Sequence, residues 1–178
     1  MRITVYAGSS RQARPEFLEL AAALGTTVAA RGHVLIYGGG NTGLMGAAAE
    51  AALGAGGRVE GVILRDFIEH GVHHDGLHEL RVVNDMRSRK AGLDGPAEAF
   101  VALPGGYGTF EELAEILSFR KLGFHNRPVV LLDRDDFWKP WSELLQNAVR
   151  AGFEKPERLS FYRVTEDAGE AVHWCETG

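Results

Sequence analysis

The stretch AFVALPGGYGTFEEL, residues 99–113, decides the fold class of this chain. Its apolar first part is typical of a buried strand, and the apolar positions after the glycines recur at helical spacing. A strand that passes through a glycine-rich turn directly into a helix is the repeating unit of parallel α/β proteins. Two other stretches of the chain, AGSS (residues 7–10) and GGGNTGLMG (residues 38–46), follow apolar runs in the same way.

Short runs rich in β-branched and apolar residues predict the strands of the sheet. Several of these runs are apolar on both faces, as parallel strands covered by helices should be. The predicted strands cover residues 3–7, 33–37, 58–64, 80–83, 99–103, 128–133 and 161–165.

Longer patterns with helical periodicity lie between these runs. They predict helices from Pro15 to just before Gly32, over 43–53, over 109–123, and over 137–152 with Pro140 in the first turn. Residues 65–79 read as a loop with a short helix. The alternation predicts an α/β, doubly wound, Rossmann-like fold: a mostly parallel sheet of about seven strands with helices on both faces. Residues 1–178 are expected to form a single domain.

Composition restricts the classes of partner. Apolar residues make up 45% of the 178 residues, charged residues make up 24%, and the net charge is −5. This balance argues against nucleic acid or an anionic membrane as the main partner. The single cysteine, Cys175, cannot form an internal disulfide, and no apolar run approaches the roughly 20 residues that span a bilayer. The sequence therefore predicts a cytoplasmic protein.

The three glycine-rich turns predict a site for an anionic ligand. In an open α/β sheet, ligands bind beyond the carboxyl ends of the strands, where glycines and helix N-termini present backbone N–H groups. Three such turns on one rim favour a nucleotide or a sugar phosphate. Gly38, Gly40 and Gly43 also match the spacing of a dinucleotide-binding motif. However, this motif follows the second strand, and no clear acidic partner for a ribose ends the next one: Glu60 lies near its start and Asp66 beyond its end. An NAD-binding oxidoreductase is therefore an alternative only.

Thr109 and Glu112 have the spacing of a helix capping box, so one interpretation is that they only close the start of a helix. The neighbouring glycines favour a second interpretation, in which both side chains face a bound ligand.

The segment NDMRSRKAG, residues 84–92, is a second polar cluster. Asp85 can cap a helix whose first turns then carry Arg87, Arg89 and Lys90, and cations at a helix N-terminus oppose the helix dipole. A solvated helix face is one interpretation. A binding surface for an anion is the other.

Four histidines, His70, His73, His74 and His78, lie near acidic residues in the 65–79 segment. Their spacings do not match a helical two-histidine motif cleanly, and a solvated loop is the favoured interpretation. We expect neither a metal nor another cofactor.

The helix predicted over 109–123 carries two apolar sets. Phe110, Leu113, Ala114 and Leu117 form a stripe for the core. Ile116 and Phe119 lie beside it, where Phe119 is a candidate for a contact between subunits.

These motifs resemble those of a known family. PGGYGTFEE matches the PGGxGTxxE motif, and MRSRK matches the Met-x-x-Arg-Lys element, of the LOG ("Lonely guy") family of cytokinin riboside 5′-monophosphate phosphoribohydrolases. This family is often mislabelled as lysine decarboxylases. The resemblance implies hydrolysis of the N-glycosidic bond of a nucleoside 5′-monophosphate, such as AMP or an N6-modified AMP, to free base and ribose 5-phosphate. It also implies a homodimer or a larger homo-oligomer.

The resemblance further implies roles for individual residues. Arg89 and Glu112 match the catalytic pair of the family. The expected substrate-binding residues are Gly105, Gly106, Tyr107, Gly108, Thr109, Glu111, Lys90, Gly8, Ser9, Gly39, Gly40, Met86, Asp66 and Ser118.

Two further hypotheses for the function stand beside the hydrolase and the oxidoreductase. A non-catalytic nucleotide or cofactor carrier, like the related molybdenum-cofactor carriers, could share this fold, although the presence of both Arg89 and Glu112 disfavours it. A pyridoxal-dependent decarboxylase needs a Schiff-base lysine with a partner for the pyridinium nitrogen, and Lys90 has no evident partner of that kind.

Overall fold

The computed structural model describes residues 1–178 and contains one sheet of seven strands. The strands are β1 (Arg2–Tyr6), β2 (Val34–Tyr37), β3 (Arg58–Leu64), β4 (Glu79–Val83), β5 (Ala99–Ala102), β6 (Val129–Leu132) and β7 (Arg163–Thr165). All neighbouring strands pair in parallel. The doubly wound α/β fold expected from the sequence is confirmed.

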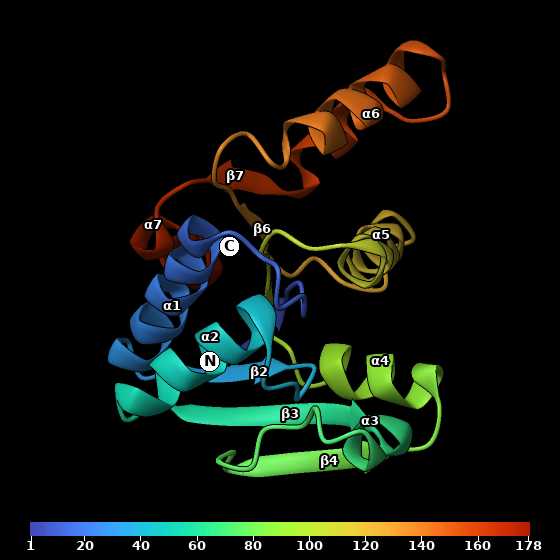
Figure 1. The fold of residues 1–178 in the computed structure, drawn as a ribbon. Coiled ribbons are helices and arrows are strands. Elements are labelled where there is room, and N and C mark those ends of the chain that lie inside the picture. The colour runs from blue at the N-terminus through green and yellow to red at the C-terminus, as the bar shows by residue number, and fades with distance from the viewer.

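The order of the strands determines where a ligand can bind. The sheet runs β4-β3-β2-β1-β5-β6-β7, so the chain builds outward from β1 in one direction and then returns to continue from β5 in the other (Figure 1). At such a reversal, the connections that leave the two central strands diverge to opposite faces and open a crevice beyond their carboxyl ends. The stretches AGSS and PGGYGT are the connections that follow β1 and β5.

Helices cover both faces of the sheet. The helices are α1 (Pro15–Ala30), α2 (Gly43–Gly54), α3 (Arg65–Glu69), α4 (Met86–Asp94), α5 (Tyr107–Lys121), α6 (Lys139–Arg150), the 3₁₀ helix η1 (Pro156–Phe161) and α7 (Ala168–Thr177). Helices α1, α2 and α7 lie on one side of the sheet, and α4 and α5 lie on the other (Figure 1). None of them is long and apolar enough to cross a membrane.

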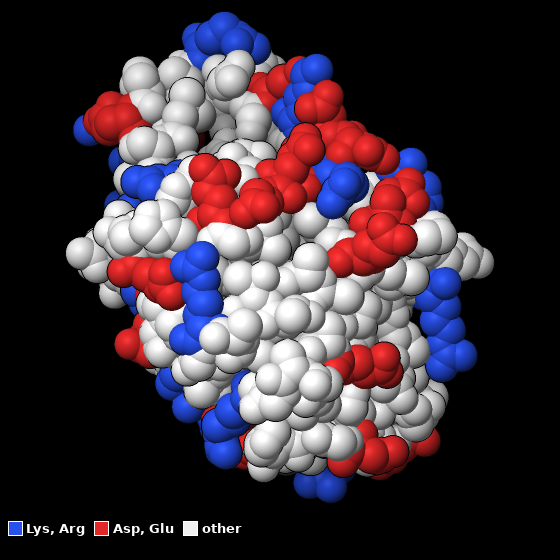
Figure 2. All heavy atoms as spheres, turned by 90° about the vertical axis from the view of Figure 1, so that its left-hand side faces the viewer, with Lys and Arg blue, Asp and Glu red and all other residues white.

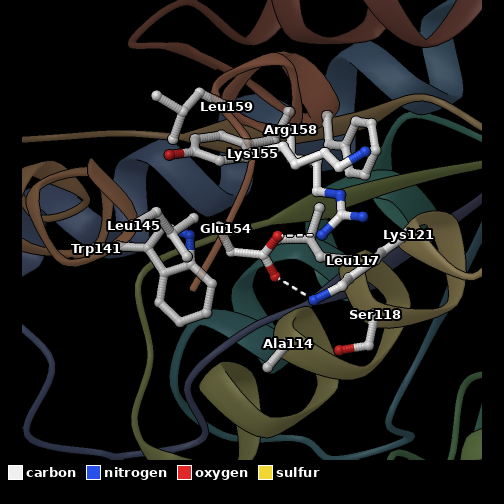
Figure 3. A pocket seen from close by; sticks show the side chains of 12 residues that line it. Ala114, Leu117, Ser118, Lys121, Trp141, Leu145, Glu154, Lys155, Arg158 and Leu159 are labelled. Atoms are coloured by element: carbon white, nitrogen blue, oxygen red, sulfur yellow. Dashed lines mark hydrogen bonds and ion pairs between the residues drawn. The ribbon is translucent and has the colours of Figure 1, made fainter. Parts of the chain in front are cut away.

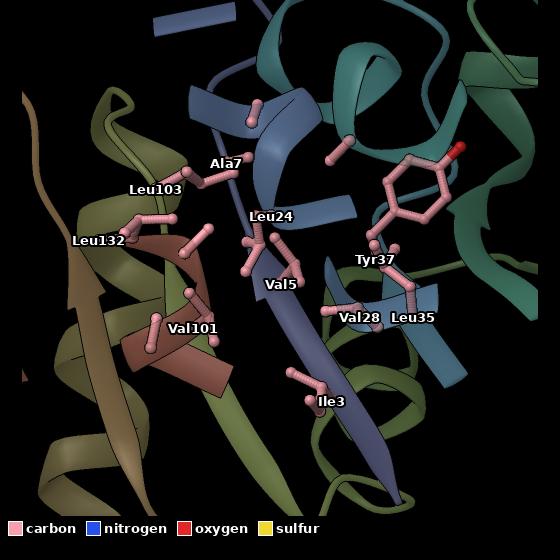
Figure 4. Close-up of a cluster of buried hydrophobic side chains, with 14 of the residues drawn as sticks. Ile3, Val5, Ala7, Leu24, Val28, Leu35, Tyr37, Val101, Leu103 and Leu132 are labelled. Carbon is pink, nitrogen blue, oxygen red and sulfur yellow. The ribbon is translucent and has the colours of Figure 1, made fainter. Parts of the chain in front are cut away.

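Each face of the sheet has its own core. The core under α1, α2 and α7 includes Ile3, Val5, Leu24 and Val101 (Figure 4). The core under α4 and α5 is built around Phe100. Small residues let α1 and α2 approach closely, because a Cβ atom on Gly25 would lie 2.1 Å from the carbonyl oxygen of Ala48.

Several predicted helix boundaries are confirmed. Pro15 is the first residue of α1, and Gly32 follows the end of that helix with a φ of +71°. Pro140 lies in the first turn of α6. Asp85 caps α4 by accepting a hydrogen bond from the backbone N–H of Ser88 at 2.9 Å. The last strand begins later than predicted, at Arg163, because Phe161 ends η1 and its carbonyl accepts from the side chain of Arg120.

The buried stripe of α5 differs from the predicted one. Leu113 and Ile116 are fully buried, and Ala114, expected in the core, is exposed. Thr109 and Glu112 are buried as well, so the inward face of the helix follows positions 109, 112, 113 and 116. The assignment of Ile116 to an outer, subunit-facing set was therefore wrong, because this side chain packs in the core.

The surface offers no continuous basic area on the face shown in Figure 2. Acidic side chains run across its upper part, and basic side chains are scattered around its edges (Figure 2). This distribution agrees with the net charge of −5.

Candidate active site

A cavity of about 610 Å³ lies at the carboxyl ends of the central strands. The turn after β1 and the turn after β5 form its floor, and the starts of α4 and α5 form one wall. Ten of the predicted site residues line it: Gly8, Ser9, Met86, Arg89, Gly105, Gly106, Tyr107, Gly108, Thr109 and Glu112. The structure thus brings the glycine turns and the two charged candidates into one space.

Arg89 and Glu112 form an ion pair in this cavity. Nη1 of Arg89 donates to Oε1 of Glu112 at 3.0 Å, and the two residues are only 8% and 9% exposed. The cap at Asp85 sets the start of α4, which places Arg89 on the side facing α5. Removing one partner of such a buried pair leaves an uncompensated charge, so each residue depends on the other.

The capping-box interpretation of Thr109 and Glu112 was wrong. Helix α5 begins at Tyr107, two residues earlier than expected, and its N-cap is Gly106, which has no side chain to cap with. Thr109 and Glu112 therefore lie within the helix, past its N-cap, and no side chain caps the start of α5. Glu112 uses its carboxylate on Arg89 instead.

The guanidinium of Arg89 keeps unused donors. Its Nε is buried and has no hydrogen-bond partner in the protein. Its Nη2 lies over Gly38, at 2.3 Å from the position that a Cβ atom would take there. Gly38 thus provides the space for the guanidinium, and alanine at this position would displace it. A buried donor without a partner is costly, so the unused donors favour a ligand at this site.

Burial raises the pKa of Glu112 above its ordinary value of 4.5. The positive charge of Arg89 acts in the opposite direction, and the nearby negative charge of Asp94 adds to the rise. Asp94 is itself buried and accepts a hydrogen bond from the hydroxyl of Tyr6. A perturbed carboxyl group in a cavity is characteristic of functional sites.

The turns after β1 and β5 pack directly on each other. The backbone N–H of Gly8 donates to the carbonyl of Pro104 at 3.1 Å, and a Cβ on Gly105 would lie 2.1 Å from Oγ1 of Thr109. Gly106 and Gly108, in contrast, face open space. Glycine is needed at 105 for packing, whereas at 106 and 108 its absence of a side chain leaves the backbone accessible to a ligand.

The glycines of the second turn serve packing. A Cβ on Gly39 would meet Ile63 and Leu80, and Gly43, with a φ of +60°, approaches the backbone of Ser9. With Gly38 beneath Arg89, packing explains two of the three glycines of the dinucleotide-like spacing, Gly38 and Gly43.

Six predicted binding residues lie outside the cavity lining: Lys90, Glu111, Gly39, Gly40, Asp66 and Ser118. Lys90 binds Glu111 and Glu115, so these charges join α4 to α5. The cations of α4 thus divide into exposed Arg87 and two residues that are paired with α5. Asp66 is exposed on α3, and its neighbour Phe67 lines the cavity instead.

Ser118 lies in a separate cavity. This space of about 150 Å³ lies between α5 and the segment around η1 (Figure 3). The carboxylate of Glu154 there binds both Lys121 and Arg158, and these two cations lower its pKa to about 2. Ser118 is therefore not placed near Arg89 and Glu112.

Several residues that line the cavity were not predicted from the sequence. They include Gln12, Arg14, Phe17, Met45 and Phe137. Gln12 and Arg14 lie in the connection after β1, whose glycine signal ends at residue 10, and Phe17 lies in the first turn of α1. Phe137 follows β6, and it reaches the cavity only because β6 lies next to β5.

The histidine segment is a short helix, α3, followed by a loop, as expected from the sequence. The backbone N–H of His74 donates to the carbonyl of Gly39, and the N–H of Asn41 donates to the carbonyl of Val72, both at 3.0 Å. These bonds attach the segment to the second glycine turn. No group of three or more His, Cys, Asp or Glu side chains is arranged to hold a metal ion.

Comparisons with known proteins identify the family. A family model described as "Possible lysine decarboxylase" matches residues 45–175. A cytokinin riboside 5′-monophosphate phosphoribohydrolase of Rhodococcoides fascians is 41% identical over 172 residues, which cover 96% of this chain and 86% of that protein. An Arabidopsis thaliana protein with the same enzyme name is 40% identical over 175 residues, covering 98% and 81%.

The solved structures show the fold alone. The molybdenum cofactor carrier protein of Chlamydomonas reinhardtii superimposes with a TM-score of 0.75 at 23% identity, covering 99% of this chain and 96% of that one. The relatives at about 40% identity are similar to this chain in sequence over most of its length. The chain belongs to the LOG family of cytokinin riboside 5′-monophosphate phosphoribohydrolases, the group that the family model describes as possible lysine decarboxylases.

Proposed function

We propose that this protein hydrolyses the N-glycosidic bond of AMP or an N6-modified AMP, such as a cytokinin riboside 5′-monophosphate, to free base and ribose 5-phosphate. The observation that carries the proposal is the buried Arg89–Glu112 pair, which lines the cavity at the reversal of the strand order. The enzyme names of the relatives support the substrate class.

The carboxylate suits the charge that develops in this reaction. The bond between C1′ and the base nitrogen breaks while a bond forms from a water oxygen to C1′; the base nitrogen takes the electron pair and a proton, and the water loses a proton. Positive charge accumulates on the ribose as the base departs, and a fixed carboxylate stabilises it. We assign this role to Glu112. Arg89 holds Glu112 in place and offers its remaining donors to the substrate.

The glycine turns suit the 5′-phosphate. Gly106 and Gly108 face open space at the start of α5, where backbone N–H groups and the helix dipole attract an anion. Thr109, buried in the first turn, lies beside them.

We expect the enzyme to require this phosphate. Cleavage of AMP should exceed cleavage of adenosine by at least about 100-fold in kcat/KM, because the nucleoside forgoes the charge-assisted bonds at the glycine turns. Free base released from both compounds, followed by chromatography, measures the ratio. Equal rates on the two compounds would contradict a phosphate site.

A panel of nucleotides tests the reaction itself. The protein is incubated with AMP, N6-prenylated AMP, GMP and CMP, and free base and ribose 5-phosphate are quantified. Release of both products from at least one adenine nucleotide supports the proposal. Tight binding of a nucleotide without release of base would favour the alternative, a non-catalytic carrier, whose fold this chain shares.

We expect turnover to persist without divalent metal. The reaction proposed here uses the charges of Arg89 and Glu112, and the acidic and histidine side chains form no cluster of metal-binding geometry. Activity is compared before and after dialysis against a chelator. Loss of activity that zinc or magnesium restores would contradict this expectation.

We also propose a homo-oligomer, at least a dimer, as the family resemblance implies. Phe119 packs edge-on against Phe124 with ring centroids 5.8 Å apart. Phe124 itself and the nearby Leu122 are 74% and 65% exposed. Burial of these side chains between subunits would remove apolar surface from water. Light scattering at assay concentration measures the mass, and a fully active monomer would refute the proposal.

A further inference from the structure

The charges of the cavity leave one cation without a role in the reaction. Only three charged residues line the cavity: Arg14, Arg89 and Glu112. The charge of Arg89 is balanced by Glu112. A 5′-phosphate carries close to two negative charges at neutral pH, so Arg14 is the cation left to meet it. On the basis of the function proposed above, we propose that Arg14 binds the 5′-phosphate of the substrate, and that the phosphate displaces Asp135 from Arg14 when it binds.

Arg14 is held by weak, exchangeable partners. Its Nη2 lies 2.9 Å from Oδ2 of Asp135 and its Nη1 lies 3.0 Å from Oε1 of Glu16, but the side chains of Arg14 and Asp135 are 55% and 52% exposed. Exposed ion pairs contribute little stability, whereas a guanidinium binds a phosphate through two parallel charge-assisted hydrogen bonds. A phosphate can therefore replace Asp135 at little cost.

A chain of aromatic contacts links Arg14 to the start of α5. The guanidinium lies 4.5 Å from the ring centroid of Phe17. The Phe17 ring packs edge-on against Phe137, at 6.0 Å, and Phe137 stacks with Phe110, at 6.3 Å. Phe110 belongs to the first turn of α5, and its N–H donates to the carbonyl of Gly106. Arg14 and the glycine backbone at this helix start line the same cavity.

The turn that carries Asp135 is strained. Asp135 and Asp136 have φ values of +56° and +57°, and they are the only residues other than glycine in the left-handed region. Oδ1 of Asp133 holds the turn by accepting from the N–H groups of Arg134, at 2.7 Å, and Trp138, at 3.2 Å. Backbone strain of this kind concentrates at functional sites. Here it presents the carboxylate of Asp135 to Arg14, across from the connection after β1.

Arg14→Gln tests the proposal against a matched control. Arg11→Gln removes a charge from the same connection, but Arg11 is exposed and does not line the cavity. Binding of AMP, ribose 5-phosphate and adenosine is measured by calorimetry, with kcat and KM for AMP. We expect Arg14→Gln to raise Kd and KM for the two phosphates roughly 10- to 100-fold, with kcat and adenosine binding nearly unchanged. Arg11→Gln should behave like the wild type.

The competing role of Asp135 has its own test. Asp135→Asn should lower the Kd for AMP by about 2- to 5-fold, because the phosphate no longer displaces a charged partner. If the Kd for AMP does not fall in Asp135→Asn, the proposal that the phosphate displaces Asp135 from Arg14 is overturned.

The outcomes separate this inference from the proposed function. Phosphate binding that depends on Arg14 in a protein that releases no base supports Arg14 and refutes the hydrolase. Hydrolysis with unchanged phosphate affinity in Arg14→Gln supports the hydrolase and overturns the role of Arg14. An equal loss of AMP and adenosine binding also overturns it. Failure of the wild type to bind or cleave any phosphate rejects both.

Discussion

Glu112→Gln is expected to lower kcat for the nucleotide by about 10²–10³-fold while the substrate still binds. Glutamine has nearly the same shape, and its carbonyl can still accept the hydrogen bond from Nη1 of Arg89 at the observed 3.0 Å. What it loses is the negative charge that stabilises the ribose cation. Turnover at saturating AMP, Kd by calorimetry and circular dichroism separate the loss of rate from losses of binding or folding.

Glu111→Gln is the control for this experiment. Glu111 is the preceding residue of α5, but its side chain is 52% exposed, binds Lys90 and does not line the cavity. We expect its kcat to stay within a few-fold of the wild type. Near-normal turnover in Glu112→Gln would remove Glu112 from the chemistry and leave it a structural partner of Arg89.

Arg89→Met is expected to abolish most turnover and to destabilise the fold in a pH-dependent way. Without Arg89, the carboxylate of Glu112 stays buried and unpaired, which costs about 3–5 kcal/mol when it is ionised. The pKa of Glu112 is already raised by burial, and the variant loses the charge that opposes this rise. A folded state with a raised carboxyl pKa binds more protons than the unfolded state above the ordinary value of 4.5, so its stability falls as pH increases.

Urea denaturation at pH 5 and pH 8 measures this effect. The deficit of Arg89→Met relative to the wild type should be larger at pH 8, where the folded protein must bury the ionised carboxylate. The double variant Arg89→Met, Glu112→Leu removes both charges and should recover stability without recovering turnover. A deficit that is equal at both pH values, or a double variant as unstable as the single one, would contradict the buried pair as described.

Local patterns predicted most elements of the fold but not helix α7, and long-range packing decided the rest. Alternating strands and helices predict a parallel sheet, because each apolar run must be covered on both faces. The order of the strands does not follow from any local pattern, because it depends on how helices and strands that are far apart in the sequence pack together. The start of α5 was misplaced for a local reason: a glycine N-cap carries no side-chain signal, and the Thr109–Glu112 spacing imitates one.

The candidate site was also predicted only in part, for the same reason. The glycine turns, Arg89 and Glu112 are recognisable because each belongs to a short motif. Arg14 and Phe137 are not, because they reach the cavity only through the placement of β1 and β6 on the two sides of β5. Asp66 was expected in the site because of the family resemblance, but Phe67, the next residue of the short helix α3, lines the cavity instead.

Gly38 contributes to the candidate active site through the side chain that it lacks. The guanidinium of Arg89 occupies the volume that any other side chain at position 38 would fill. A relative could therefore keep the arginine and the glutamate and still hold them in a different geometry if it carried alanine there. Assigning this chemistry to other sequences, or transferring it to another scaffold, therefore requires a glycine at this position as well as the arginine and the glutamate.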